Sequence, residues 1–102
     1  MDELEALRQE YAKELPGRMA EIQRLWEDIK AVENAELLQQ FQHQVHKLAG
    51  SGAVYGFIKL SDAAHELDTL LLHHTRSGVA LNGEGHSRVS ELLSQMRQAL
   101  KI

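Results

Sequence analysis

The sequence predicts an all-α protein, an antiparallel four-helix bundle with a short additional helix at its N-terminus. Apolar residues recur every three or four positions along nearly the whole chain, which is the spacing of one face of an α-helix. No segment shows the alternation of apolar and polar residues that is typical of a β-strand. With 102 residues, the chain is long enough for one domain and too short for two, so we expect a single helical domain over residues 1–102.

A proline divides the first helical segment. An apolar stripe runs from Leu4 to Ile29 at helical spacing, and Pro16 and Gly17 interrupt it. Because proline removes a helical hydrogen bond and clashes with the preceding turn, we expect a short helix before it, a bend, and then a longer helix. Asn34 follows, and asparagine is a favourable N-cap, so the next helix is expected to begin there.

Glycines mark the ends of the remaining helices. Gly56 suits a left-handed residue at the end of the helix that follows Asn34. Residues 57–71 resume the helical spacing almost at once, and so short a connection makes the two helices antiparallel neighbours. Residues 75–85 contain three glycines and are expected to form a loop. Apolar residues from Val89 to Leu100 then predict the last helix.

Composition argues against several classes of function. The net charge is −4 and the eleven lysines and arginines are scattered, whereas nucleic-acid binding needs clustered positive charge. The chain has no apolar run long enough to cross a bilayer and no signal peptide, so we expect a cytoplasmic protein without a membrane partner. It contains no cysteine, which removes disulfides and thiolate metal sites. A helical domain of this size rarely builds the deep pocket that most enzymes use.

Residues 43–56 are unusual because two glycines, Gly50 and Gly52, lie inside a segment with helical spacing. A glycine in a helix interior costs about 1 kcal/mol relative to alanine, so each of the two should have a reason. Gly52 continues the apolar stripe, and we expect it to allow close packing against a neighbouring helix. Gly50 lies off that stripe and needs a different explanation.

The explanation for Gly50 is its neighbour His46, four positions earlier on the same helical face. Ala49 and Ala53 follow His46 by three and seven positions, so the imidazole is expected to lie beside a patch of very small side chains. His46 itself is expected at the edge of the apolar stripe, partly exposed. A reactive imidazole beside bare helix surface suits a domain-sized partner better than a small substrate.

This segment resembles the signature of the histidine-containing phosphotransfer (HPt) domain family. In that signature a phosphorylatable histidine is followed by Leu, Lys, Gly and Ser at the second to fifth positions, and later by a Gly, a Leu and a Leu-Glu pair. The residues that match, with Asp68 as a conservative replacement of the glutamate, are His46, Leu48, Gly50, Ser51, Gly56, Leu60 and Leu67. One position departs from the signature, because the family's lysine is Ala49 here. Lys47 directly follows the histidine, about 100° around the helix, and cannot simply replace that lysine on the same face.

The resemblance implies a phosphorelay intermediate rather than an enzyme with kinase activity of its own. His46 would accept a phosphoryl group from the aspartate of one receiver domain and pass it to the aspartate of another. The implied partners are the receiver domains of response regulators and of a hybrid sensor kinase. The receiver would supply Mg²⁺, and the chain itself would need no cofactor. The residues expected to line or support the docking surface are Gln42, His43, Lys47, Ala49, Gly50 and Ala53.

Two other functions remain open. One is a non-catalytic helical interaction or scaffold bundle with an HPt-like fold. The other is the dimerisation and phosphoacceptor domain of a sensor kinase, in which an acidic residue and then a proline typically follow the histidine. The sequence after His46 is Lys-Leu-Ala-Gly-Ser, which disfavours this second alternative. His43 and His46 lie three positions apart, but no third ligand completes a helical metal motif, so no metal site is expected.

Overall fold

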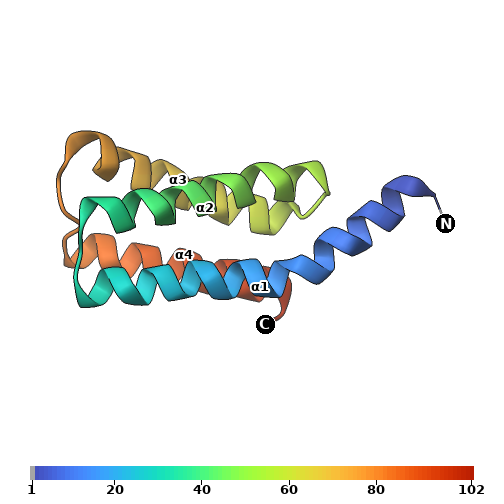
Figure 1. The fold of residues 1–102 in the computed structure, drawn as a ribbon, viewed down its shortest axis with the longest axis horizontal. Coiled ribbons are helices and arrows are strands. Elements are labelled where there is room, and N and C mark those ends of the chain that lie inside the picture. The colour runs from blue at the N-terminus through green and yellow to red at the C-terminus, as the bar shows by residue number, and fades with distance from the viewer. Residues whose placement is uncertain (1) are drawn as a thin grey trace.

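The computed structural model describes residues 2–102. In this part of the chain four α-helices form an antiparallel bundle, namely α1 (Glu3–Ala31), α2 (Ala35–Val54), α3 (Ile58–Ser77) and α4 (Gly83–Leu100). Each helix runs opposite to the one before it, and in Figure 1 α2 and α3 form one side of the bundle while α1 and α4 form the other. The all-α class and the antiparallel four-helix bundle are therefore confirmed.

The first helix differs from the prediction. α1 is continuous from Glu3 to Ala31 with Pro16 inside it, so the expectation of a separate short N-terminal helix is wrong. Figure 1 shows α1 changing direction as it leaves the bundle toward its N-terminus, so the expected bend is present. The helix continues through the proline because Tyr11 and Leu15, on the turns before it, are buried and hold those turns against the bundle. The hydroxyls of Tyr11 and Ser51 lie 2.7 Å apart, which ties this part of α1 to α2.

Both ends of α2 form as their capping residues predict. The backbone N–H of Leu37 donates to Oδ1 of Asn34 at 2.8 Å, so Asn34 is the N-cap. α2 ends at Val54, and Gly56 takes the left-handed conformation with φ of 83°. The backbone N–H of Phe57 then donates back to the carbonyl of Gly52 at 2.8 Å. This compact turn reverses the chain, so that α3 runs back along α2.

The connection between α3 and α4 is shorter than predicted. Residues 75–85 are expected to be a loop, but α3 continues to Ser77 and α4 begins at Gly83. Gly78 is left-handed, with φ of 71°, and ends α3. The side chain of Asn82 accepts a hydrogen bond from the backbone N–H of Gly85 at 2.7 Å and caps α4. The cap at Asn82 therefore starts the helix at Gly83, although Gly83 and Gly85 have low helix propensity. Only residues 78–82 connect the two helices.

A single apolar core fills the bundle. Trp26 on α1 and Phe41 on α2 are fully buried and stack with their ring centroids 5.7 Å apart, so both belong to the core. Gly52 lies against the start of α3: a Cβ at this position would be 3.5 Å from the Cβ of Ser61 and 3.7 Å from the carbonyl oxygen of Phe57. Gly52 therefore packs against the start of α3 as expected, although a methyl group at this position would make only ordinary van der Waals contacts. None of the helices described for residues 2–102 is both long and apolar enough to cross a lipid bilayer.

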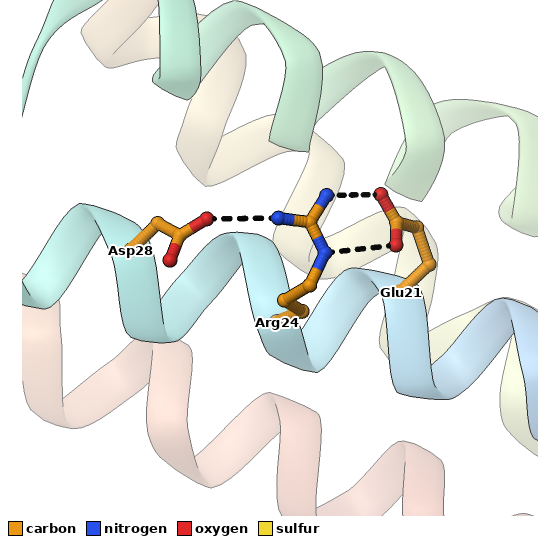
Figure 2. A network of polar contacts seen from close by, with 3 residues as sticks. All are labelled: Glu21, Arg24 and Asp28. Atoms are coloured by element: carbon orange, nitrogen blue, oxygen red, sulfur yellow. Dashed lines mark hydrogen bonds and ion pairs between the residues drawn. The ribbon is translucent and has the colours of Figure 1, made fainter.

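The outward side of α1 carries a network of charges, shown in Figure 2. The guanidinium of Arg24 donates two hydrogen bonds to Glu21, at 2.6 and 3.0 Å, and one to Asp28 at 3.0 Å. The hydrogen bond from Arg24 lowers the pKa of Glu21, and the same bond raises the pKa of Arg24. All three side chains remain substantially exposed, and exposed ion pairs contribute little to stability. This face of α1 is therefore a solvated helix surface.

The two glycines within α2 should respond differently to a larger side chain. Leucine at position 52 would have to displace Ser61 and the turn at Phe57, so we expect Gly52→Leu to lower the free energy of unfolding by about 1–3 kcal/mol. Gly50→Leu should fold normally, since no atom lies within 4 Å of the position its Cβ would take. Thermal unfolding of both variants tests this difference. Gly52→Ala is the control, because its Cβ would make only ordinary contacts; equal melting temperatures for the two leucine variants would contradict the packing argument.

Candidate functional site

His46 lies on α2 with its side chain directed away from the core. Val45 and Leu48, on either side of it in the sequence, are buried and fix the orientation of the helix. The side chain of His46 is 64% exposed. The expected position at the edge of the apolar stripe is therefore confirmed, and a large partner can reach the ring directly from solvent.

A buried carboxylate from the neighbouring helix holds one side of the imidazole. Asp68 lies on α3, its side chain is only 5% exposed, and its Oδ2 is 2.8 Å from Nδ1 of His46. A carboxylate oxygen accepts hydrogen bonds, so this contact is made when Nδ1 carries the proton and donates. In the neutral ring, Nε2 then holds the lone pair. The geometry thus prepares Nε2, and not Nδ1, to act as a nucleophile.

The second oxygen of Asp68 is also occupied. Nε2 of Gln42, on α2 one turn before His46, donates to Oδ1 of Asp68 at 2.7 Å. Burying a carboxylate is costly unless hydrogen bonds replace those it made with water. Gln42 and His46 supply one such bond to each oxygen, and both come from the same helix. The three side chains therefore form one connected group across the α2–α3 interface.

Asp68 is the residue that sequence reasoning missed as part of the site, although it was matched to the family signature. A signal was present, because Asp68 directly follows Leu67 within the apolar pattern that runs from Leu60 to Leu71. An acidic residue next to a buried stripe needs hydrogen-bond donors in the folded protein. The sequence alone does not show that the donor is His46, since this depends on how α3 is rotated against α2.

The small-residue patch beside His46 is only partly as expected. Gly50 and Ala53 are exposed, and no atom lies within 4 Å of the position a Cβ on Gly50 would take. Ala49, by contrast, is buried at 7% exposure, so its expected place on the open surface is wrong. Ala49 and Gly50 lie on opposite sides of His46 around the helix, and α3 covers the Ala49 side. There the hydroxyl of Ser61 donates to the carbonyl oxygen of Ala49 at 2.7 Å.

The remaining predicted residues are exposed on α2. Lys47 directly follows His46 in the sequence, and His43 lies about one turn before it. Both side chains are open to solvent. Lys47 is thus exposed, whereas Ala49 is buried. Position 49, where the family has its lysine, is covered by α3 in this chain. Within residues 2–102, no three side chains of the His, Cys, Asp and Glu types are grouped so that they could hold a metal ion.

The fold and the site together define a class of protein. A small antiparallel helical bundle presents an exposed imidazole, with one ring nitrogen held by a buried carboxylate, and this arrangement suits a carrier of a group on histidine. The sequence matches the family model for the Hpt domain over residues 6–99, and the chain belongs to this family. Hpt domains are phosphocarrier modules that work with receiver domains in the phosphorelays of two-component systems. Neither the curated proteins nor the solved structures gave a match.

Removing the carboxylate should change the tautomer of His46. We expect long-range ¹H–¹⁵N NMR spectra of the wild-type protein to show His46 mainly as the form protonated on Nδ1, because Asp68 accepts that proton. Asp68→Ala should shift the ring toward the form protonated on Nε2. Asp62→Ala, which changes an exposed aspartate of the same helix, is the control and should leave the ring unchanged. Identical His46 spectra in wild-type and Asp68→Ala proteins would show that the hydrogen bond does not set the tautomer.

Proposed function

We propose that this chain is a phosphorelay intermediate in which Nε2 of His46 accepts a phosphoryl group from a receiver-domain aspartate and passes it to an aspartate of another receiver. The observation that carries the proposal is the hydrogen bond between Nδ1 of His46 and the buried Asp68, on a ring that is otherwise open to solvent. The partners we propose are response-regulator receivers and the receiver of a hybrid sensor kinase, in the cytoplasm.

The proposed transfer requires from this chain one nucleophilic nitrogen and a carboxylate that keeps the proton on the other ring nitrogen. The lone pair on Nε2 forms a bond to phosphorus, while the bond from phosphorus to the receiver's aspartate oxygen breaks and its electron pair stays on that carboxylate. The proton remains on Nδ1, so positive charge develops on the ring, and the carboxylate of Asp68 stabilises it. In the second step an aspartate oxygen of the next receiver attacks phosphorus, and the electrons of the phosphorus–nitrogen bond return to Nε2.

The partner would complete the site. Phosphoryl transfer depends mainly on positioning and on neutralising the charge of the phosphoryl oxygens. We propose that the receiver domain supplies Mg²⁺ and most of this neutralisation, and that the chain needs no cofactor and has no kinase activity of its own. The bare surface at Gly50 and Ala53 would admit the receiver next to the imidazole. Lys47, which is exposed and has a long side chain, would contribute positive charge at the edge of the contact.

The acceptor assignment is tested by removing the imidazole. His46→Gln should abolish labelling by a phosphorylated receiver and leave helicity intact, because the side chain is mostly exposed and contributes little to packing. Labelling is measured as acid-labile, base-stable phosphate on the protein. His43→Gln, three positions away on the same helix, should not abolish labelling. Full labelling of His46→Gln would refute the assignment, and an unlabelled wild-type protein would favour a non-catalytic scaffold.

The docking role of Gly50 is tested by adding bulk without disturbing the fold. Arginine is a good helix former and would extend into water, so Gly50→Arg should hold or raise the melting temperature. It should nevertheless slow transfer from a receiver by roughly tenfold or more, since displaced reacting groups lose their alignment. Labelling by phosphoramidate, which is too small to need the surface, should change much less, and Gly50→Ala is the matched control. Normal receiver-dependent transfer in Gly50→Arg would show that the bare surface has no role in docking.

A further inference from the structure

We propose that Gln42 is a positioning residue for His46. By donating to one oxygen of Asp68, it turns the other oxygen toward Nδ1 and so keeps the lone pair of the imidazole on Nε2. The kinetic part of this inference rests on the phosphotransfer function proposed above. Its structural part, the control of the ring tautomer through Asp68, does not.

The geometry gives the carboxylate two fixed contacts. Gln42 and His46 are separated by one turn of α2, and their donors reach different oxygens of the same carboxylate, at 2.7 and 2.8 Å. The terminal torsion of an aspartate side chain is soft, so one hydrogen bond leaves the carboxylate plane free to rotate. Two donors spaced by a helical turn fix that plane. The position of the oxygen that faces His46 therefore depends on the bond at the other oxygen.

The chemistry of the groups allows only one direction for the Gln42 contact. A carboxylate oxygen offers lone pairs, and of the two polar atoms of the glutamine amide only the nitrogen can donate. Because the side chain of Asp68 is 5% exposed, water has little access to the oxygen that Gln42 occupies. Without the amide, the carboxylate would be left with an unpaired buried oxygen, or it would rotate to improve its own hydrogen bonding. Either change alters the contact with Nδ1.

A positioning residue of this kind has a kinetic signature that differs from that of a docking residue. When Nε2 is phosphorylated, and again when it releases the phosphoryl group, the proton stays on Nδ1 and faces Asp68. Loss of the Gln42 contact should therefore slow the phosphorylation of Nε2, in which positive charge develops on the ring, and it should slow this step for every phosphodonor, large or small. A change at Gly50, in contrast, should matter only for receiver domains.

The test compares Gln42→Met with Gln40→Met. Methionine has nearly the length of glutamine but no donor, and Gln40 is an exposed glutamine on the same helix. Gln42→Met should shift His46 toward the tautomer protonated on Nε2 in long-range ¹H–¹⁵N NMR spectra. It should also slow labelling by phosphoramidate roughly two- to tenfold, the range expected for one hydrogen bond. Gln40→Met should change neither, and Gln42→Ala is a second variant if the methionine disturbs the fold.

A double variant shows whether Gln42 acts through Asp68. In the Asp68→Ala background, Gln42→Met should have no further effect on the tautomer or on the labelling rate, because the carboxylate it orients is gone. Additive effects would overturn the proposal, as would an unchanged tautomer in the single variant. A shifted tautomer with a normal labelling rate would overturn the kinetic part. If the tautomer shifts but the wild-type protein accepts no phosphoryl group from any donor, the positioning role stands and the phosphotransfer function fails.

Discussion

The site depends on how closely α2 and α3 approach each other. The acidic residue that holds His46 is an aspartate, whose side chain is one methylene shorter than the glutamate of the family signature, so the two helix backbones must lie near one another for Asp68 to reach Nδ1 at 2.8 Å. Small residues line this approach. Gly52 leaves room for the start of α3, and the buried hydroxyl of Ser61 bonds directly to the backbone of α2 at Ala49. A bulkier residue at Gly52 would separate the two sides of the site.

The close interface also explains how a charged group is tolerated inside the bundle. Asp68 is nearly inaccessible to water, and the protein replaces its hydration with donors from a single turn of α2. One of those donors is the imidazole of His46 itself. The contact that orients the ring thus also offsets the cost of burying the carboxylate. This couples the stability of the α2–α3 interface to the orientation of the His46 ring.

The arrangement places an exposed imidazole on a helix that is held by the core. His46 sits between buried neighbours on a helix that is capped at both ends, so the position of its ring is set by the scaffold while its free nitrogen remains open. A phosphoryl carrier must present the same atom to more than one partner, and a deep pocket would prevent this. The bundle therefore needs only a well-placed ring and bare surface beside it.

The sequence by itself determined the parts of this protein that depend on local chemistry. Helical spacing predicted the bundle, Asn34 and Gly56 marked the ends of α2, and the pattern around His46 predicted an exposed histidine in an Hpt domain. These features follow from backbone geometry and from residues within a turn or two of one another, which are visible in a linear sequence.

Only the tertiary structure decided the features that depend on which helix covers which side. It kept α1 continuous through Pro16, because Tyr11 and Leu15 bury the turns before the proline against the rest of the bundle. It placed Ala49 under α3 although helical spacing puts it as near to His46 as Gly50, and it brought Asp68 to the imidazole from 22 positions along the chain. Periodicity shows which face of a helix is apolar, but the rotation of one helix against another arises from packing across the whole core.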